Sequence, residues 1–203
     1  MRRIPTLALV TLLAWTASSV MAQKSKTRPV IALAPIGRVS SADIEALVTP
    51  LREVFDADVV VAPGLELPAS VFDKTRGQYL STALLDLLAR ARRQEWQRLL
   101  GVADVDLYVP QLNFVFGEGD PHRGVAVFSL ARLRSPDEAL FHRRSATEAI
   151  HELGHAYGLA HCDNPRCVMW FSNTLTESDR KGVSFCYRHA AQLARLRGEG
   201  LRP

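Results

Sequence analysis

The sequence predicts a single α/β (α+β) domain in which helices pack on a twisted mixed sheet. The chain has 203 residues, enough for one domain with a core and short for two. Its composition, 47% hydrophobic and 23% charged, is typical of a globular protein and not of a disordered one. Apolar runs of strand length alternate with segments of helical period, and this order favours helices on a sheet.

The first half of the chain alternates between strand and helix signals. Residues 30–34 form a continuous apolar run and predict a buried strand. Ser40 or Ser41 can cap a following helix, whose apolar residues share one face. Residues 58–62 predict a second strand. A longer helix is expected over residues 78–93, where leucines form a stripe and the opposite side is basic.

The second half adds strands and ends in a helix. Residues 106–109 predict a third strand. Two further strands, residues 114–116 and 125–128, are expected to flank a glycine-rich connection over residues 117–124. A final helix is predicted over residues 177–197.

The N-terminus has the features of an export signal. Two arginines precede an apolar stretch over residues 7–15, and residues 20–22 (Val-Met-Ala) resemble a cleavage site. We therefore predict a signal peptide over residues 1–22 and a mature domain over residues 23–203, which is periplasmic or secreted. The alternative is a membrane anchor, but a spanning helix needs about 20 apolar residues. No other segment of the sequence is apolar enough to span a membrane.

Charge and cysteine content narrow the class of protein. The formal net charge is +4 for the full chain, and it falls to +2 without residues 1–22, which contain two arginines and no acid. This excess is too small to indicate nucleic acid as a partner. Three cysteines are too few for a disulfide scaffold.

One motif indicates the chemistry. Residues 151–161 read His-Glu-Leu-Gly-His-Ala-Tyr-Gly-Leu-Ala-His. His151 and His155 are four residues apart, so on a helix they share one face and can reach one metal ion. Gly158 can adopt a left-handed conformation, end the helix and let His161 approach the same ion. Three protein ligands leave a fourth position for water, the pattern of a catalytic zinc site.

The helix that carries the motif also places a general base. Ser145 and Glu148 have the spacing of a capping box, so the helix is expected to begin near Ala146. Glu152 directly follows the first histidine and lies beside the metal without needing to bind it. A glutamate in that position can take a proton from a zinc-activated water.

The motif predicts a monomeric zinc metallopeptidase that acts on peptides or proteins. Two alternatives remain: a non-catalytic, zinc-binding secreted module, and a zinc hydrolase of a non-peptide amide or ester. The motif does not separate an endopeptidase from an aminopeptidase. An aminopeptidase needs a carboxylate for the substrate's free amine, and Glu118, Asp120 and Asp137 are candidates by their position in the chain.

The residues after the motif carry a family resemblance. Cys162 follows the motif at once, then come residues 167–169 (Cys-Val-Met) and residues 186–189 (Cys-Tyr-Arg-His). Over residues 30–189 the chain resembles the archaemetzincin family of the metzincin clan. The resemblance implies a zincin-like domain whose active-site helix is followed by a Met-turn and a C-terminal helix. It also implies that the three histidines bind the catalytic zinc.

The resemblance further implies a second, structural zinc, and therefore two zinc ions per chain. Its ligands would be Cys162, Cys167, Cys186 and His189, the last in place of a family cysteine. Three cysteines and a histidine are an accepted structural set. In an oxidising compartment Cys162 and Cys167 could instead pair as a disulfide. Met169 would be the Met-turn residue, a hydrophobic floor beneath the histidines.

Substrate contacts are also implied by the resemblance. Metzincins are expected to pair an edge strand with an extended peptide through main-chain hydrogen bonds. Residues 125–128 are the candidate strand, with Gly124, Val125 and Ala126 as the expected substrate-binding residues.

Overall fold

The computed structural model describes residues 28–198, so the predicted signal peptide lies outside the described residues. Its centre is a five-stranded sheet in the order β2-β1-β5-β8-β7. The first four strands are parallel and β7 runs antiparallel to β8, so the sheet is mixed, as predicted. The strands comprise Val30–Ile36 (β1), Asp58–Val61 (β2), Arg98–Ala103 (β5), Gly117–Asp120 (β7) and Val125–Ser129 (β8).

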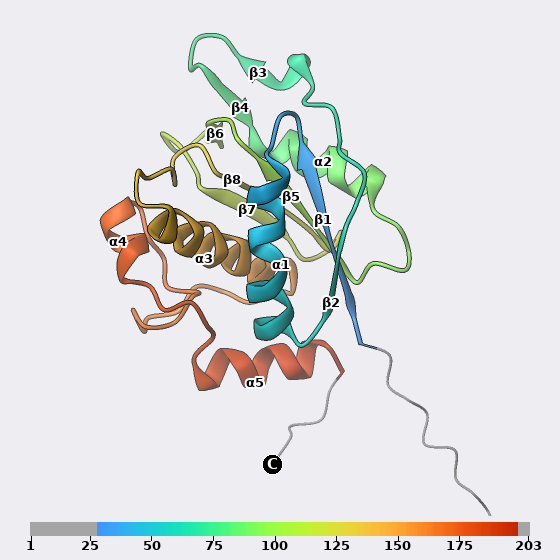
Figure 1. The fold of residues 1–203 in the computed structure, drawn as a ribbon, viewed down its shortest axis with the longest axis vertical. Helices are drawn as coiled ribbons and strands as arrows, with labels where there is room; N and C mark the ends of the chain where they lie inside the picture. The colour runs from blue at the N-terminus through green and yellow to red at the C-terminus, as the bar shows by residue number, and fades with distance from the viewer. Residues whose placement is uncertain (1–27, 199–203) are drawn as a thin grey trace, which may run out of the picture.

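Helices cover both faces of this sheet (Figure 1). α1 (Ser41–Phe55) and α3 (Glu138–Ala156) pack on one face, and α2 (Ser81–Ala91) packs on the other. Ile31 and Leu33 of β1 belong to the core beneath α1 and α3, whereas Ala32 belongs to the core beneath α2. A strand that is buried on both faces has no polar alternation, which explains the continuous apolar run.

A smaller sheet, a 3-10 helix and two α-helices complete the fold. The small sheet has the order β3-β4-β6. α5 runs below α1 and α3 in the view of Figure 1. None of the helices among the described residues is long and apolar enough to cross a membrane. These elements comprise a 3-10 helix (Ala69–Val71), β3 (Phe72–Asp73), β4 (Gln78–Leu80), β6 (Leu107–Tyr108), α4 (Leu175–Arg180) and α5 (Tyr187–Leu196).

The first elements of the chain agree with the predictions. The Ser40 hydroxyl caps α1 by accepting a hydrogen bond from the Ala42 backbone N–H at 3.2 Å. Residues 58–61 form β2, one residue shorter than predicted. β1 continues through Pro35 to Ile36, two residues beyond the predicted end.

One strand was missed and two other predictions were wrong. The central strand β5 was not predicted. The helix expected over residues 78–93 begins only at Ser81, because residues 78–80 pair with β3 and β6. The single helix expected over residues 177–197 is two helices, α4 and α5, with a non-helical connection over residues 181–186.

The glycine-rich stretch was also misassigned. Residues 117–120 form strand β7, and the connection to β8 is only residues 121–124. Residues 114–116 lie outside the named strands, although Val115 forms an isolated bridge with Leu107.

The predicted start of the motif helix was wrong as well. α3 begins at Glu138, where the Asp137 carboxylate accepts from the Leu140 backbone N–H at 3.2 Å. Ser145 lies inside the helix and donates its hydroxyl to the Phe141 carbonyl oxygen at 2.8 Å. A serine in a helix interior can bond to the carbonyl four residues earlier, so capping-box spacing alone does not mark a helix start.

Candidate metal centre and active site

The C-terminal half of α3 carries His151, Glu152 and His155. This part of the helix packs against β7 and β8 on one side and α1 on another. The side chains of His151 and Glu152 are therefore almost fully buried, each 5% exposed. A buried helix fixes the positions of these polar groups more firmly than a loop would.

Gly158 ends the helix as predicted. Its φ of +94° lies in the left-handed region that glycine adopts without strain. The Gly158 N–H donates to the His155 carbonyl at 2.8 Å, and the Leu159 N–H donates to the Gly154 carbonyl at 3.0 Å. The chain thus turns sharply and brings His161 back toward the helix.

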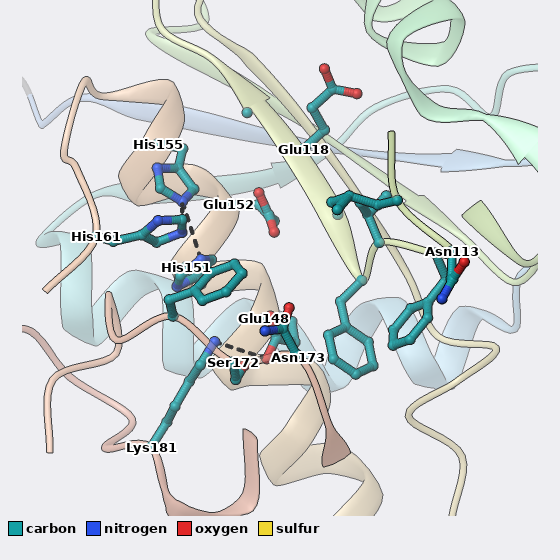
Figure 2. Close-up of a pocket in the computed structure, with 17 residues that line it drawn as sticks. Asn113, Glu118, Glu148, His151, Glu152, His155, His161, Ser172, Asn173 and Lys181 are labelled. Carbon is teal, nitrogen blue, oxygen red and sulfur yellow. Dashed lines mark hydrogen bonds and ion pairs between the residues drawn. The ribbon is translucent and has the colours of Figure 1, made fainter. Parts of the chain in front are cut away.

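The three histidines of the motif converge on one point (Figure 2). The Nε2 atom of His155 lies 3.1 Å from Nε2 of His151 and 3.2 Å from Nε2 of His161. A zinc ion with tetrahedral nitrogen ligands at about 2.0–2.1 Å would separate those nitrogens by about 3.3 Å. The spacing therefore fits the coordination of a single zinc ion.

The other ring nitrogens fix the tautomers of the two helical histidines. Nδ1 of His151 donates to the Val168 carbonyl at 2.8 Å, and Nδ1 of His155 donates to the Leu159 carbonyl at 2.8 Å. A carbonyl only accepts, so both Nε2 atoms carry lone pairs. Two lone pairs at 3.1 Å repel each other unless a cation lies between them, which again fits a metal ion.

Burial keeps these histidines neutral. It lowers the pKa of His151 well below its ordinary value, with the positive charge of Lys181 as the next cause. Burial also lowers the pKa of His155 to about 4 and lowers the pKa of His161. Neutral imidazoles are the form that binds metals. Burial, reinforced by Glu148, raises the pKa of Glu152 well above its ordinary value.

A second cluster contains all three cysteines of the chain. The ligand atoms of Cys162, Cys167, Cys186 and His189 lie within 4.8 Å of one another. The Sγ atoms of Cys162 and Cys186 are 3.9 Å apart, and His189 Nδ1 lies 3.8 Å from Cys167 Sγ and 3.4 Å from Cys186 Sγ. Sulfur ligands at about 2.3 Å in a tetrahedron would be about 3.8 Å apart. All three thiols are free in this arrangement.

The Cys186 thiol is prepared for deprotonation. Burial raises its pKa, but hydrogen bonds from the His189 backbone and ring and from the neighbouring thiols outweigh burial and lower the pKa to about 6. Arg188 adds a positive group, because its Nη2 donates to Cys162 Sγ at 3.4 Å. Thiolates are the form of cysteine that binds metals.

Comparison with known proteins places the chain in a family. The family model described as Peptidase family M54 matches residues 41–195. This chain belongs to peptidase family M54. Its relatives include archaemetzincins, and the protein is a zinc metallopeptidase.

Several relatives support this placement of the M54 peptidase. The archaemetzincin of Methanopyrus kandleri is 48% identical over 64% of this chain and 74% of its own length. That of Archaeoglobus fulgidus is 39% identical over 76% of this chain and 93% of its own length. A crystal structure of the Methanopyrus kandleri protein aligns with a TM-score of 0.78 and 39% identity, covering 86% of this chain and 98% of that one. A zinc-dependent peptidase from Methanocorpusculum labreanum aligns with a TM-score of 0.70 and 30% identity, covering 80% of this chain and 99% of that one.

Met169 of the M54 peptidase lies against the active-site helix. It is fully buried, and its sulfur occupies the space into which a Cβ on Gly154 would project. The Met169 carbonyl accepts from the Cys162 N–H at 2.9 Å. The segment around Met169 is thereby tied both to α3 and to the start of the cysteine cluster.

Two glycines of β7 let this strand pack directly on α3. A Cβ on Gly117 would lie 2.5 Å from Cγ of Glu152, and a Cβ on Gly119 would lie 2.6 Å from Cβ of His155. Any side chain at either position would therefore push the strand away from α3. The Gly-x-Gly pattern was available in the sequence, but it was assigned to a loop.

The cleft of the M54 peptidase has a volume of about 480 Å³. One wall consists of residues 112–119, and the opposite wall carries the histidines and residues 171–173 (Figure 2). Glu148 and Lys181 also line this cleft, and sequence reasoning missed both as site residues. Nothing in the local sequence brings Lys181 to α3, because the contact joins segments far apart in the chain.

The predicted substrate strand was wrong. β8 is an interior strand, in which Val125 pairs with Leu99 on one side and Asp120 on the other, and Ala126 is likewise paired on both sides. Their main-chain groups are therefore not available to a substrate. Gly124 lies in the turn before β8 with φ +67°. The edge strand of the sheet on this side is β7.

The carboxylates considered for binding a substrate amine are already engaged. Glu118 accepts hydrogen bonds from the hydroxyls of Ser81 and Thr82 at the start of α2. Asp120 pairs with Arg123 at 2.5 Å. Asp137 is the N-cap of α3.

Proposed function

We propose that the protein hydrolyses peptide bonds with a zinc ion held by His151, His155 and His161 and with Glu152 as general base. The observation that carries this proposal is the convergence of three Nε2 atoms, 3.1 and 3.2 Å apart, at a cleft that Glu152 also lines. Three protein ligands leave a position for the reacting groups.

The zinc ion and Glu152 would have separate roles in the reaction. When bound, zinc would polarise the scissile carbonyl and lower the pKa of the attacking water. Glu152 takes the proton of that water and passes it to the leaving amine. Glu152 is buried and lines the same cleft, so its carboxyl group is placed to hold the proton between the two transfers.

The substrate is proposed to lie along β7. This strand is the free edge of the sheet, and Gly117, Glu118 and Gly119 line the cleft. An extended peptide can add to such an edge through main-chain hydrogen bonds. The absence of a side chain at Gly117 lets this edge lie directly against Glu152.

The test compares Glu152→Gln with a matched variant on the same helix. We expect Glu152→Gln to lower the rate of hydrolysis of a mixed protein digest by about 10²–10⁴-fold while zinc content is unchanged. Glu138→Gln, whose side chain is 85% exposed at the start of α3, should retain both. Full activity of Glu152→Gln would overturn the assignment. Bound zinc without activity in the native chain would favour a non-catalytic module.

We also propose that Cys162, Cys167, Cys186 and His189 bind a second, structural zinc. The near-tetrahedral spacing of their ligand atoms supports it. Metal analysis should give two zinc ions per chain. One zinc ion and no free thiol at Cys162 and Cys167 would instead indicate a disulfide.

Export is a further part of the proposal. The arginines and apolar stretch before residue 22 support a cleaved signal peptide. Expression of the full chain in a bacterium, cell fractionation and N-terminal sequencing would test it. We expect a periplasmic or secreted product that begins at Gln23, and an uncleaved product in the cytoplasm would contradict the proposal.

A further inference from the structure

The cleft ends in a buried ion pair beyond His151. Lys181 Nζ lies 3.3 Å from Glu148 Oε1, and their side chains are only 1% and 2% exposed. Ser178 donates its hydroxyl to the same Glu148 oxygen at 2.6 Å. Figure 2 shows this pair on the far side of His151 from His155. No step of the proposed mechanism uses these groups.

The backbone holds Lys181 firmly in this place. Arg143 of α3 donates to the Lys181 carbonyl oxygen at 2.9 Å. The next residue, Gly182, packs so tightly on the Arg166 carbonyl that a Cβ there would overlap it. The ammonium is thus a fixed part of the cleft, and its position does not depend on a mobile surface chain.

The polar groups at this end of the cleft can form more hydrogen bonds than the described residues provide. An ammonium has three donors, and the described residues give Lys181 Nζ one side-chain acceptor, at 3.3 Å, longer than the usual 2.7–2.9 Å of a charge-assisted bond. Ser172 Oγ is buried and has no hydrogen-bond partner within the described part of the chain. Buried polar groups in native proteins are nearly always bonded, so this end is suited to a polar ligand group.

We propose that the end of the cleft binds the carboxamide side chain of a glutamine or asparagine next to the scissile bond. The inference rests on the proposed function. A carboxamide oxygen can accept from Lys181 while its NH₂ donates to Glu148, so both halves of the ion pair gain a partner. The apolar side chains of Phe114, Val115 and Phe116 line the same cleft and suit the aliphatic stem.

Other side chains match the ion pair less well. A substrate carboxylate would be attracted by Lys181 but repelled by Glu148. A substrate ammonium would be attracted by Glu148 but repelled by Lys181. A leucine of similar size would leave both groups without a new partner. Sites built to bond a polar substrate group reject analogues that lack it far more strongly than apolar pockets reject a size change.

The test uses peptide hydroxamates that differ only in the side chain next to the metal-binding group. Calorimetry on the zinc-loaded full chain would give Kd values for the glutamine, glutamate, lysine and leucine members. We expect the glutamine member to bind at least about tenfold more tightly than each of the others. Equal Kd values, or tighter binding of another member, would overturn the inference and leave the metal centre intact. If no member binds, the proposed zinc centre fails and the inference fails with it.

A paired variant tests the residues themselves. Glu148→Leu combined with Lys181→Met replaces the ion pair by apolar groups of similar volume, an exchange that proteins often tolerate. We expect the preference for glutamine over leucine to fall to about equal Kd values, and a retained preference would overturn the assignment. The control is Arg144→Met combined with Asp179→Leu, another ion pair of α3, at 2.7 Å, that does not line the cleft. If the variant Glu148→Leu with Lys181→Met does not fold, the Kd values of the hydroxamates on the native chain are sufficient to test the inference.

Discussion

Gly117 leaves the space in which the Glu152 side chain lies. A Cβ at residue 117 would be 2.5 Å from Glu152 Cγ and equally close to the Val127 carbonyl oxygen. The neighbouring strand β8 closes one side and α3 closes the other, so neither can move aside cheaply. The position of Glu152, the proposed general base, therefore depends on the absence of a side chain on the edge strand.

Gly117→Ala should impair catalysis more than stability. The added methyl group must displace Glu152 or the strand, and a displacement of about 1 Å near the reacting groups can reduce kcat/KM about a hundredfold. The free energy of unfolding should fall by about 1–3 kcal/mol. Peptidase assays and urea denaturation would measure the two effects.

Gly64→Ala is the matched control for this variant. A Cβ at residue 64 would lie 3.7 Å from the Pro35 carbonyl oxygen, an ordinary contact. We expect Gly64→Ala to have the same kcat/KM as the native protein. Unchanged kcat/KM in Gly117→Ala would show that Glu152 is not confined as described.

His189 should be replaceable by cysteine but not by alanine. We expect His189→Cys to retain two zinc ions per chain, because a thiolate can take the same tetrahedral position. His189→Ala should lose the second zinc. His161 is bonded directly to Cys162, so the affinity for the remaining zinc should fall about 10–100-fold. Metal titration of the three proteins would check both expectations.

If His189→Ala still binds the second zinc ion, His189 is not a ligand of that site. If the variant loses the second zinc ion while its affinity for the first is unchanged, the two metal sites do not depend on each other. The helix holds His151 and His155 independently, so His161 is the ligand expected to move first.

The metal-free protein should lose stability as the pH falls from about 6.5 toward 4. The pKa of His155 is about 4 in the folded protein, below the ordinary histidine value of 6.5, so the unfolded chain binds more protons in this interval. His151 and His161 shift in the same direction. Glu152 opposes them, because its raised pKa makes the folded state hold a proton above pH 4.5.

The histidines outnumber the glutamate, so the net effect is a loss of stability toward acid. Each excess proton changes the free energy of unfolding by about 1.4 kcal/mol per pH unit. Urea denaturation across this pH range would give the slope. We expect His155→Gln to flatten it and His122→Gln, at an exposed turn position, to leave it unchanged. A slope of the opposite sign would contradict the burial of these histidines.

Peptides with blocked N-termini should be cleaved as well as free ones. A free amine in a cleft needs a carboxylate partner. Glu118 is bonded to Ser81 and Thr82, and Asp120 is paired with Arg123. A peptide series with free and acetylated N-termini would measure the ratio of kcat/KM, and a strong preference for free termini would indicate an aminopeptidase.

The sequence predicted the features that depend on local pattern. The histidines converge because helical spacing and one glycine turn dictate their positions, and α1 begins at Ser40 because a side-chain cap is a local signal. The strand Arg98–Ala103 was missed because a short apolar run without alternation does not distinguish strand from helix.

Features that depend on contacts between distant segments were not predictable in this way. Residues 117–120 have the composition of a loop and become a strand because their glycines fit against α3. Lys181 and Glu148 meet only when the connection after α4 crosses the helix. Two helices replaced one at the C-terminus because residues 181–186 must pass through this contact and reach the cysteine cluster.

The place of Cys186 and His189 at the start of the last described helix has a consequence for biosynthesis. These two proposed ligands leave the ribosome after the whole histidine motif has been made. If the second zinc holds His161 in position, a nascent chain cannot complete its catalytic centre until α5 has emerged and folded back. The order of synthesis would then delay proteolytic activity and protect the translation machinery from the enzyme that it is producing.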